Sequence, residues 1–129
     1  MKKPIVILLL ALLCGCDDLF EKDISGRSPE ILAPADSAVV APAELMLLWR
    51  PMEGADAYRI TVVSPDFAHA GQVLADTVVS GCRYIQRGLR PGTCQWSVSA
   101  FNFGYDSPAA VRTLIVRDDE STHPIVVPR

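Results

Sequence analysis

The sequence predicts an all-β protein, a sandwich of seven short antiparallel strands. Apolar and polar residues alternate cleanly over 57–64 and 93–101, which is the pattern of strands with one buried face. Turn residues (Gly, Pro, Asn and Asp) separate such runs about every 8 to 15 residues. After residue 28 we find no apolar stripe at the helical period of about 3.6 residues.

The runs between turns define the strands. The first is a short edge strand at 31–32 that Pro34 ends, because proline cannot donate to a strand ladder. A turn at 52–56, a turn at 91–92 and a loop at 102–108 separate later runs. The other six strands are predicted at 44–49, 57–64, 72–79, 83–87, 93–101 and 111–116.

The alternation also predicts which side chains form the core. Two tryptophans stand on the inner faces of different strands, and bulky aromatics bury the most area per residue. Cys94 is also predicted to point inward, because it stands on the same face of the strand 93–101 as the second tryptophan. The predicted core centres on Trp49, Tyr58, Ile60, Trp96 and Val98.

The N-terminal residues predict an export signal. Residues 1–15 hold 11 of the 64 hydrophobic residues, and Lys2 and Lys3 precede an apolar run at 5–13. Nine apolar residues are too few to span about 30 Å of hydrocarbon as a helix, but they suit the core of a signal peptide. A buried N-terminal strand or a short anchor helix is the alternative. The other 114 residues are 46% hydrophobic, ordinary for one domain of about 100 residues.

The export signal ends in Leu13-Cys14-Gly15-Cys16, which resembles the lipobox of bacterial lipoproteins. The resemblance implies cleavage before Cys16 and acylation of Cys16, with palmitate among the expected chains. Several acyl chains give stable membrane anchoring where one is marginal. The expected location is the outer membrane of a Gram-negative bacterium, with the mature chain carrying 10 basic and 15 acidic residues.

Acidic residues follow Cys16, so residues 16–28 are predicted to form an acidic tether. They include Asp17, Asp18 and Glu21. Similar segments in lipoproteins of Bacteroidetes act as surface-export signals, which implies a place on the cell surface. Two alternatives stay open: retention at the inner membrane, as Asp beside the Cys implies in enteric-type bacteria, or a solvated linker without signalling value.

Four further stretches carry a family resemblance. Residues 47–51 (LLWRP) and 54–62 (GADAYRITV) resemble the second and third strands of fibronectin type III domains. Residues 89–92 (LRPG) and 96–102 (WSVSAFN) resemble their fifth-to-sixth-strand corner. The match implies an Ig-like, fibronectin type III sandwich over 29–117, with 118–129 as a tail, and the chain is similar to small surface lipoproteins of Bacteroidetes. One departure is Cys94, which stands where the family usually has the tyrosine of that corner.

Cys82 and Cys94 are predicted to be free thiols. Each opens one of two successive antiparallel strands, so they lie at opposite ends, on the order of 15 Å apart at about 3.3 Å per residue. A disulfide needs Cα atoms within about 7 Å. The bacterial cell envelope permits disulfides, so this prediction depends only on the distance between the two cysteines.

Several function classes are not expected. The two histidines, His69 and His123, are far apart and have no spaced partner, so no metal site is predicted. No nucleophile elbow or phosphate-cradling glycine loop is present, so neither enzymatic activity nor a cofactor is predicted. The net charge of −3 disfavours nucleic acid as a partner.

Loops carry the candidate binding residues. In the loop 102–108, Phe103, Tyr105 and Asp106 surround a glycine, and exposed aromatics beside a carboxylate suit sugar stacking or a protein contact. The alternative is that these aromatics fold back onto the core. A weaker candidate is the loop 65–69, with Phe67 and His69.

Two short motifs resemble the sites at which Bacteroidetes O-glycosylate exported proteins. They consist of Asp, then Ser or Thr, then an apolar residue, and would modify Ser37 and Thr77. The expected function is a membrane-anchored surface lipoprotein, a non-enzymatic binding or accessory module for a glycan or protein ligand in the cell envelope. The alternative is a purely structural subunit or spacer of an envelope assembly.

Overall fold

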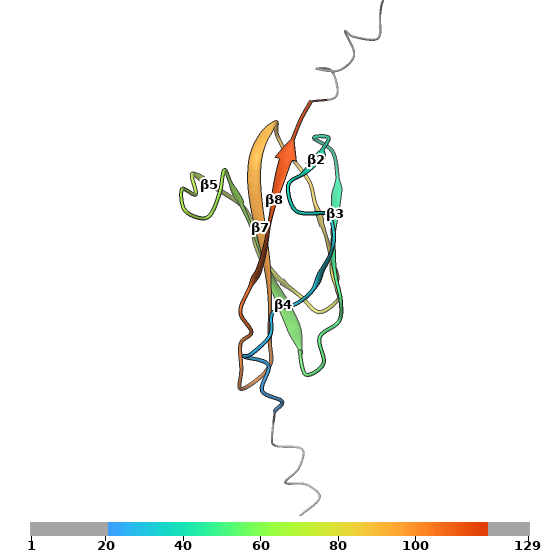
Figure 1. The fold of residues 1–129 in the computed structure, drawn as a ribbon, viewed down its shortest axis with the longest axis vertical. Helices are drawn as coiled ribbons and strands as arrows, with labels where there is room; N and C mark the ends of the chain where they lie inside the picture. Colours follow the sequence, from blue (N-terminus) through green and yellow to red (C-terminus); the bar gives the residue numbers. More distant parts are fainter. Residues whose placement is uncertain (1–20, 119–129) are drawn as a thin grey trace, which may run out of the picture.

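A computed structural model describes residues 21–118, which form eight strands and no helix (Figure 1). In this range, therefore, no helix is long and apolar enough to cross a membrane. The predicted signal peptide, Cys16 and nearly all of the predicted tail lie outside it. The strands are β1 (Ile31–Ala33), β2 (Ala38–Val40), β3 (Leu45–Trp49), β4 (Ala57–Ser64), β5 (Gln72–Val79), β6 (Arg83–Gln86), β7 (Gly92–Phe101) and β8 (Ala110–Val116).

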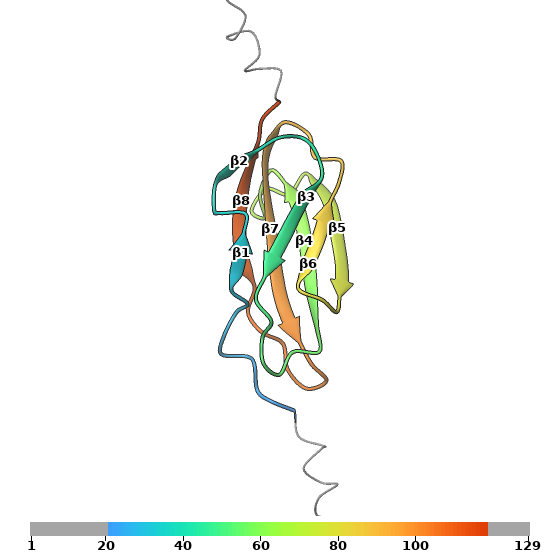
Figure 2. The same cartoon turned by 90° about the vertical axis from the view of Figure 1, so that its right-hand side faces the viewer.

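The strands form two sheets. The smaller has the order β1-β3-β6 and the larger the order β2-β8-β7-β4-β5. Figure 2 shows the smaller sheet in front of the larger one. Within each sheet neighbouring strands are antiparallel, except that β2 runs parallel to β8. The all-β prediction with two sheets is confirmed.

The predicted number of seven strands is wrong, because the described residues contain eight. The missed strand is β2, three residues long, which has no alternation to reveal it. It also makes the prediction of purely antiparallel pairing wrong, since its partner β8 runs in the same direction. A backbone hydrogen bond from Arg117 N to Val40 O (2.8 Å) extends this pair.

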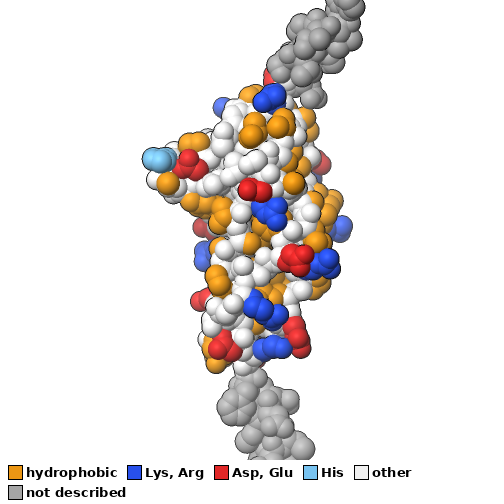
Figure 3. Space-filling model, in the orientation of Figure 1, with side chains coloured by type: hydrophobic (Ala, Val, Ile, Leu, Met, Phe, Trp, Pro, Cys, Tyr) orange, Lys and Arg blue, Asp and Glu red, His pale blue; other side chains and the backbone are white. Residues whose placement is uncertain are grey.

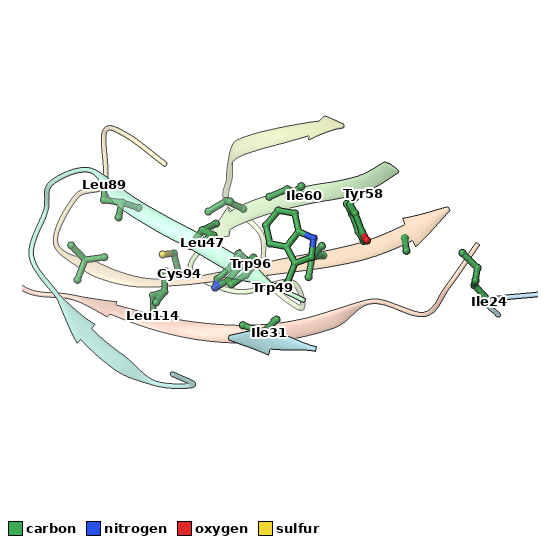
Figure 4. Close-up of a cluster of buried hydrophobic side chains, with 14 residues drawn as sticks. Ile24, Ile31, Leu47, Trp49, Tyr58, Ile60, Leu89, Cys94, Trp96 and Leu114 are labelled. Carbon is green, nitrogen blue, oxygen red and sulfur yellow. The ribbon is translucent and has the colours of Figure 1, made fainter. Parts of the chain in front are cut away.

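The core lies between the inner faces of the two sheets. All five residues at its predicted centre are at most 4% exposed. The rings of Trp49 and Trp96, from different sheets, have centroids 6.3 Å apart, and Tyr58 meets Trp49 edge-on at 5.6 Å (Figure 4). Aromatic pairs at these separations stabilise beyond the area they bury.

The domain begins earlier than its predicted start at residue 29. Ile24 is fully buried and belongs to the core cluster, although the sequence predicts that it lies in the tether 16–28. Gly54 has φ +91°, and a Cβ there would lie 2.9 Å from Lys22 Cβ and 3.0 Å from Ile24 Cγ2. The turn 52–56 therefore packs so closely on residues 22–24 that only glycine fits.

The described chain enters at one end of the molecule and leaves at the other (Figure 1). We call the ends the N-terminal pole and the C-terminal pole. The N-terminal pole carries residues 21–28 and the loops 50–56 and 102–109. The turn 87–91 lies at the C-terminal pole, and the β4–β5 hairpin loop 65–71 projects from the side of the molecule towards this pole.

Candidate functional site

The loop after β7 is organised by one buried amide, that of Asn102. Its Nδ2 donates to Lys22 O (2.8 Å) and Gly54 O (2.9 Å). Its Oδ1 accepts from Gly104 N (3.0 Å) and Tyr105 N (2.8 Å). With 6% of its surface exposed, this side chain ties three separate segments of the N-terminal pole together. Sequence reasoning missed this role.

The held loop presents Phe103 almost entirely to solvent. Phe103 is 94% exposed, whereas Tyr105 is 38% exposed. The alternative that Phe103 folds back onto the core is therefore wrong. Asp106 is exposed, and its backbone bridges to Phe101, which closes the loop. The structure thus brings the three predicted residues into one loop, with Phe103 as its exposed tip.

The loop contacts the first described residue of the chain. Phe103 N donates to Glu21 Oε1 at 3.3 Å. Beside it, Lys22 Nζ pairs with Glu53 Oε1 at 3.0 Å, and this hydrogen bond and charge hold the pKa of the Glu53 carboxyl below its ordinary value. The N-terminal pole therefore carries an exposed phenyl ring together with side chains of both charges.

The weaker candidate, the hairpin loop 65–71, projects from the side of the molecule towards the C-terminal pole (Figures 1 and 3). Asp66 Oδ1 accepts from His69 N (2.7 Å) and lies 3.1 Å from His69 Nδ1. Gln95 Oε1 accepts from Phe67 N at 2.9 Å. These bonds hold Phe67 at 39% exposure, while the His69 side chain is 80% exposed.

A hollow of about 310 Å³ opens at the base of this hairpin. Both ends of the hairpin, Ser64 and Gln72, line it together with Cys94 and the turn 88–91. Its lining combines hydroxyl, amide and guanidinium groups with leucine side chains, which is the mixture that orients a small ligand. A second hollow of about 380 Å³ lies at the N-terminal pole between residues 27–30 and 50–53. Arg50 Nε there pairs with Glu30 Oε1 at 3.1 Å.

The two described cysteines are free, as their predicted spacing requires. Cys94 is buried, and Figure 4 shows it between Leu89 and Leu114. Burial raises the pKa of its thiol, which keeps it protonated and unreactive near neutral pH. Cys82 is half-buried and lies at the other end of the core, beside Tyr58.

Tyr58 fastens the turn 52–56 to the core. Its hydroxyl accepts from Met52 N at 2.8 Å. Burial, and to a smaller degree the hydrogen bond with Cys82, raise the pKa of Tyr58. This bond therefore helps to hold the N-terminal pole together.

The two predicted glycosylation sites differ in access. Ser37 is exposed in a turn with φ 63°. Thr77 is half-buried in β5 and pairs with Ile60, whose side chain faces the core. Ser37 is therefore the better placed acceptor. Among residues 21–118, no three His, Cys, Asp or Glu side chains gather as a metal site would require.

Comparisons with known proteins give the fold. No family model and no curated protein matches the chain. The fibronectin type III domain of the human collagen α-1(XX) chain matches with a TM-score of 0.55 and 21% identity, over 72% of this chain and 84% of that one. The crystal structure of FN3tt matches with a TM-score of 0.51 and 18% identity, over 70% and 96%. At this identity the likeness is one of fold, and the chain has a fibronectin type III-like fold.

Proposed function

We propose that the protein is a lipid-anchored, non-enzymatic binding module of the outer membrane, its domain a small fibronectin type III-like sandwich. The lipobox resemblance at 13–16 supports the anchor. Likeness to surface lipoproteins of Bacteroidetes and the acidic residues after Cys16 support a place on the cell surface. The ligand class is a glycan or an envelope protein.

We assign ligand capture to the C-terminal pole. Anchoring through Cys16 leaves the N-terminal pole facing the membrane, because Glu21 at that pole is only five residues from Cys16. The opposite pole then faces the surroundings. The hollow of about 310 Å³ at the base of the hairpin 65–71 is the observation that carries the assignment, because the hollow of about 380 Å³ lies at the pole that would face the membrane.

The hairpin supplies groups suited to such a ligand. Phe67 offers an exposed ring face, and His69 a polar group on a loop that Asp66 holds in place. Arg90 contributes a cation to the lining of the hollow. Exposed aromatics next to fixed polar groups are typical of binding hot spots on loops.

Two assays test the proposal. The first measures binding of the purified domain to a glycan array, and the second crosslinks the domain to its partners in envelope extracts. The variants are Phe67→Ala, His69→Ala and Arg90→Ala, with Phe103→Ala as the matched control at the other pole. We expect a signal that falls at least about tenfold in the first three variants and persists in Phe103→Ala, with unchanged melting temperatures. A tenfold loss corresponds to about 1.4 kcal/mol of binding free energy.

Two results contradict the assignment. Loss in Phe103→Ala alone would return ligand capture to the loop 102–108. Absence of a glycan signal, together with a stoichiometric envelope partner that binds all four variants equally, would favour a structural spacer.

A further inference from the structure

We infer that Phe103 inserts into the lipid bilayer that carries Cys16 and thereby holds the domain upright on its N-terminal pole. The inference rests on the proposed lipid anchor and names the partner of the exposed loop at that pole. The lipid contact is the boundary between headgroups and acyl chains, not the hydrocarbon centre.

The side chain of Phe103 is exposed to solvent. At 94% it is the most exposed of the large hydrophobic side chains in the described residues. Its neighbours in the loop form the hydrogen bonds to Asn102, so the phenyl ring itself has no part in holding the loop. A fully hydrated phenyl ring on a fixed loop gains free energy when an apolar surface covers it.

The chain between Cys16 and the residue that contacts the loop is short. Phe103 N bonds to Glu21, and the five residues from Cys16 to Glu21 span at most about 17 Å. An acylated Cys16 lies at the membrane surface, so the loop cannot stand far from it. The phenyl ring is therefore among the first side chains of the domain to meet lipid.

Charged side chains lie at the same pole as the phenyl ring. The Lys22–Glu53 pair (3.0 Å) and Glu21 belong to the same pole, and the Lys22 and Glu53 side chains are 46% and 79% exposed. Charged groups cannot follow the ring into hydrocarbon without a large desolvation cost. They limit insertion to the interface, where amphipathic surfaces bury apolar groups about 5–10 Å deep.

The experiment reads the depth of position 103 in the acylated, full-length protein. The protein is reconstituted into vesicles of phosphatidylethanolamine and phosphatidylglycerol, with or without brominated acyl chains that quench tryptophan on contact. Phe103→Trp is the probe, and Phe67→Trp at the other pole is the matched control. The native Trp49 and Trp96 are at most 1% exposed, so their emission serves as the constant background.

We expect brominated lipid to quench Phe103→Trp and to leave both wild type and Phe67→Trp unchanged. Protein that floats with the vesicles while Phe103→Trp stays unquenched would overturn the inference and leave the anchor intact. Equal quenching of Phe67→Trp would overturn the upright orientation. Protein that does not float at all would overturn the anchor and, with it, the inference.

Discussion

Two individual side chains at the N-terminal pole hold several backbone segments in place by hydrogen bonds. Asn102 makes four hydrogen bonds from one amide, and Tyr58 holds the turn 52–56 through one hydroxyl. Both side chains are buried, and the backbone groups that they bond are partly buried, so each lost bond removes the partner of a partly buried group. Such groups cost more than an average hydrogen bond is worth.

Replacing Asn102 by Ala is expected to lower the free energy of unfolding by about 2 kcal/mol or more, since the bonds to Lys22, Gly54, Gly104 and Tyr105 all disappear. Denaturant titration measures the change. Phe103→Ala is the control, because that exposed ring supports none of these bonds, and its stability stays within about 0.5 kcal/mol of wild type. Equal stabilities of Asn102→Ala and wild type would contradict this role.

Tyr58 gives the domain a sensitivity to alkaline pH. Its pKa is raised in the folded state, so the stability it contributes is complete below its unfolded pKa of about 10 and is lost as the pH rises through the folded value. Tyr58→Phe is expected to cost about 1 kcal/mol at pH 7, where Met52 N loses its acceptor, and to flatten the decline above pH 10. Unfolding titrations at several pH values test both effects, and an unchanged alkaline slope would refute the second.

At the scale of elements, the N-terminal segment is part of the domain. Ile24 fills the core at the N-terminal pole, and Gly54 is the residue that lets it approach. We expect Ile24→Ala to lower the free energy of unfolding by about 3 kcal/mol. Leu32→Ala, at a position that is 50% exposed, is the matched control and changes little. A chain starting at residue 29 that is as stable as one starting at residue 21 would show that the segment is dispensable.

The elements also show what a sequence can and cannot predict. Strands β4 and β7 follow from alternation alone, and their predicted bounds differ from the observed ones by at most one residue. Strand β2 could not be predicted, because three residues are too few to show alternation and its partner β8 lies more than 70 residues away. Ile24 escapes because one apolar residue among acidic ones looks like a linker. Asn102 reads as a turn residue, but its bond to Lys22 O spans 80 residues.

At the scale of the whole molecule, our proposal gives the two poles different functions. Phe103 and the chain entry lie at one pole, and the hairpin 65–71 with its hollow lies towards the other. The candidate residues were predicted from local sequence, but their distribution over two poles depends on strand direction. On the basis of that distribution we propose a membrane contact for one loop and a ligand site for the other.

Acylation of Cys16 is the claim on which this division depends, and the intact mass of the protein extracted from its membrane tests it most directly. We predict a chain that starts at Cys16 and exceeds its polypeptide mass by a diacylglyceryl group and an amide-linked acyl chain. The Cys16→Ser variant is predicted to keep its leader and to lack lipid. An extracted wild-type chain that starts at Met1, or starts at Cys16 without added lipid mass, would contradict the account.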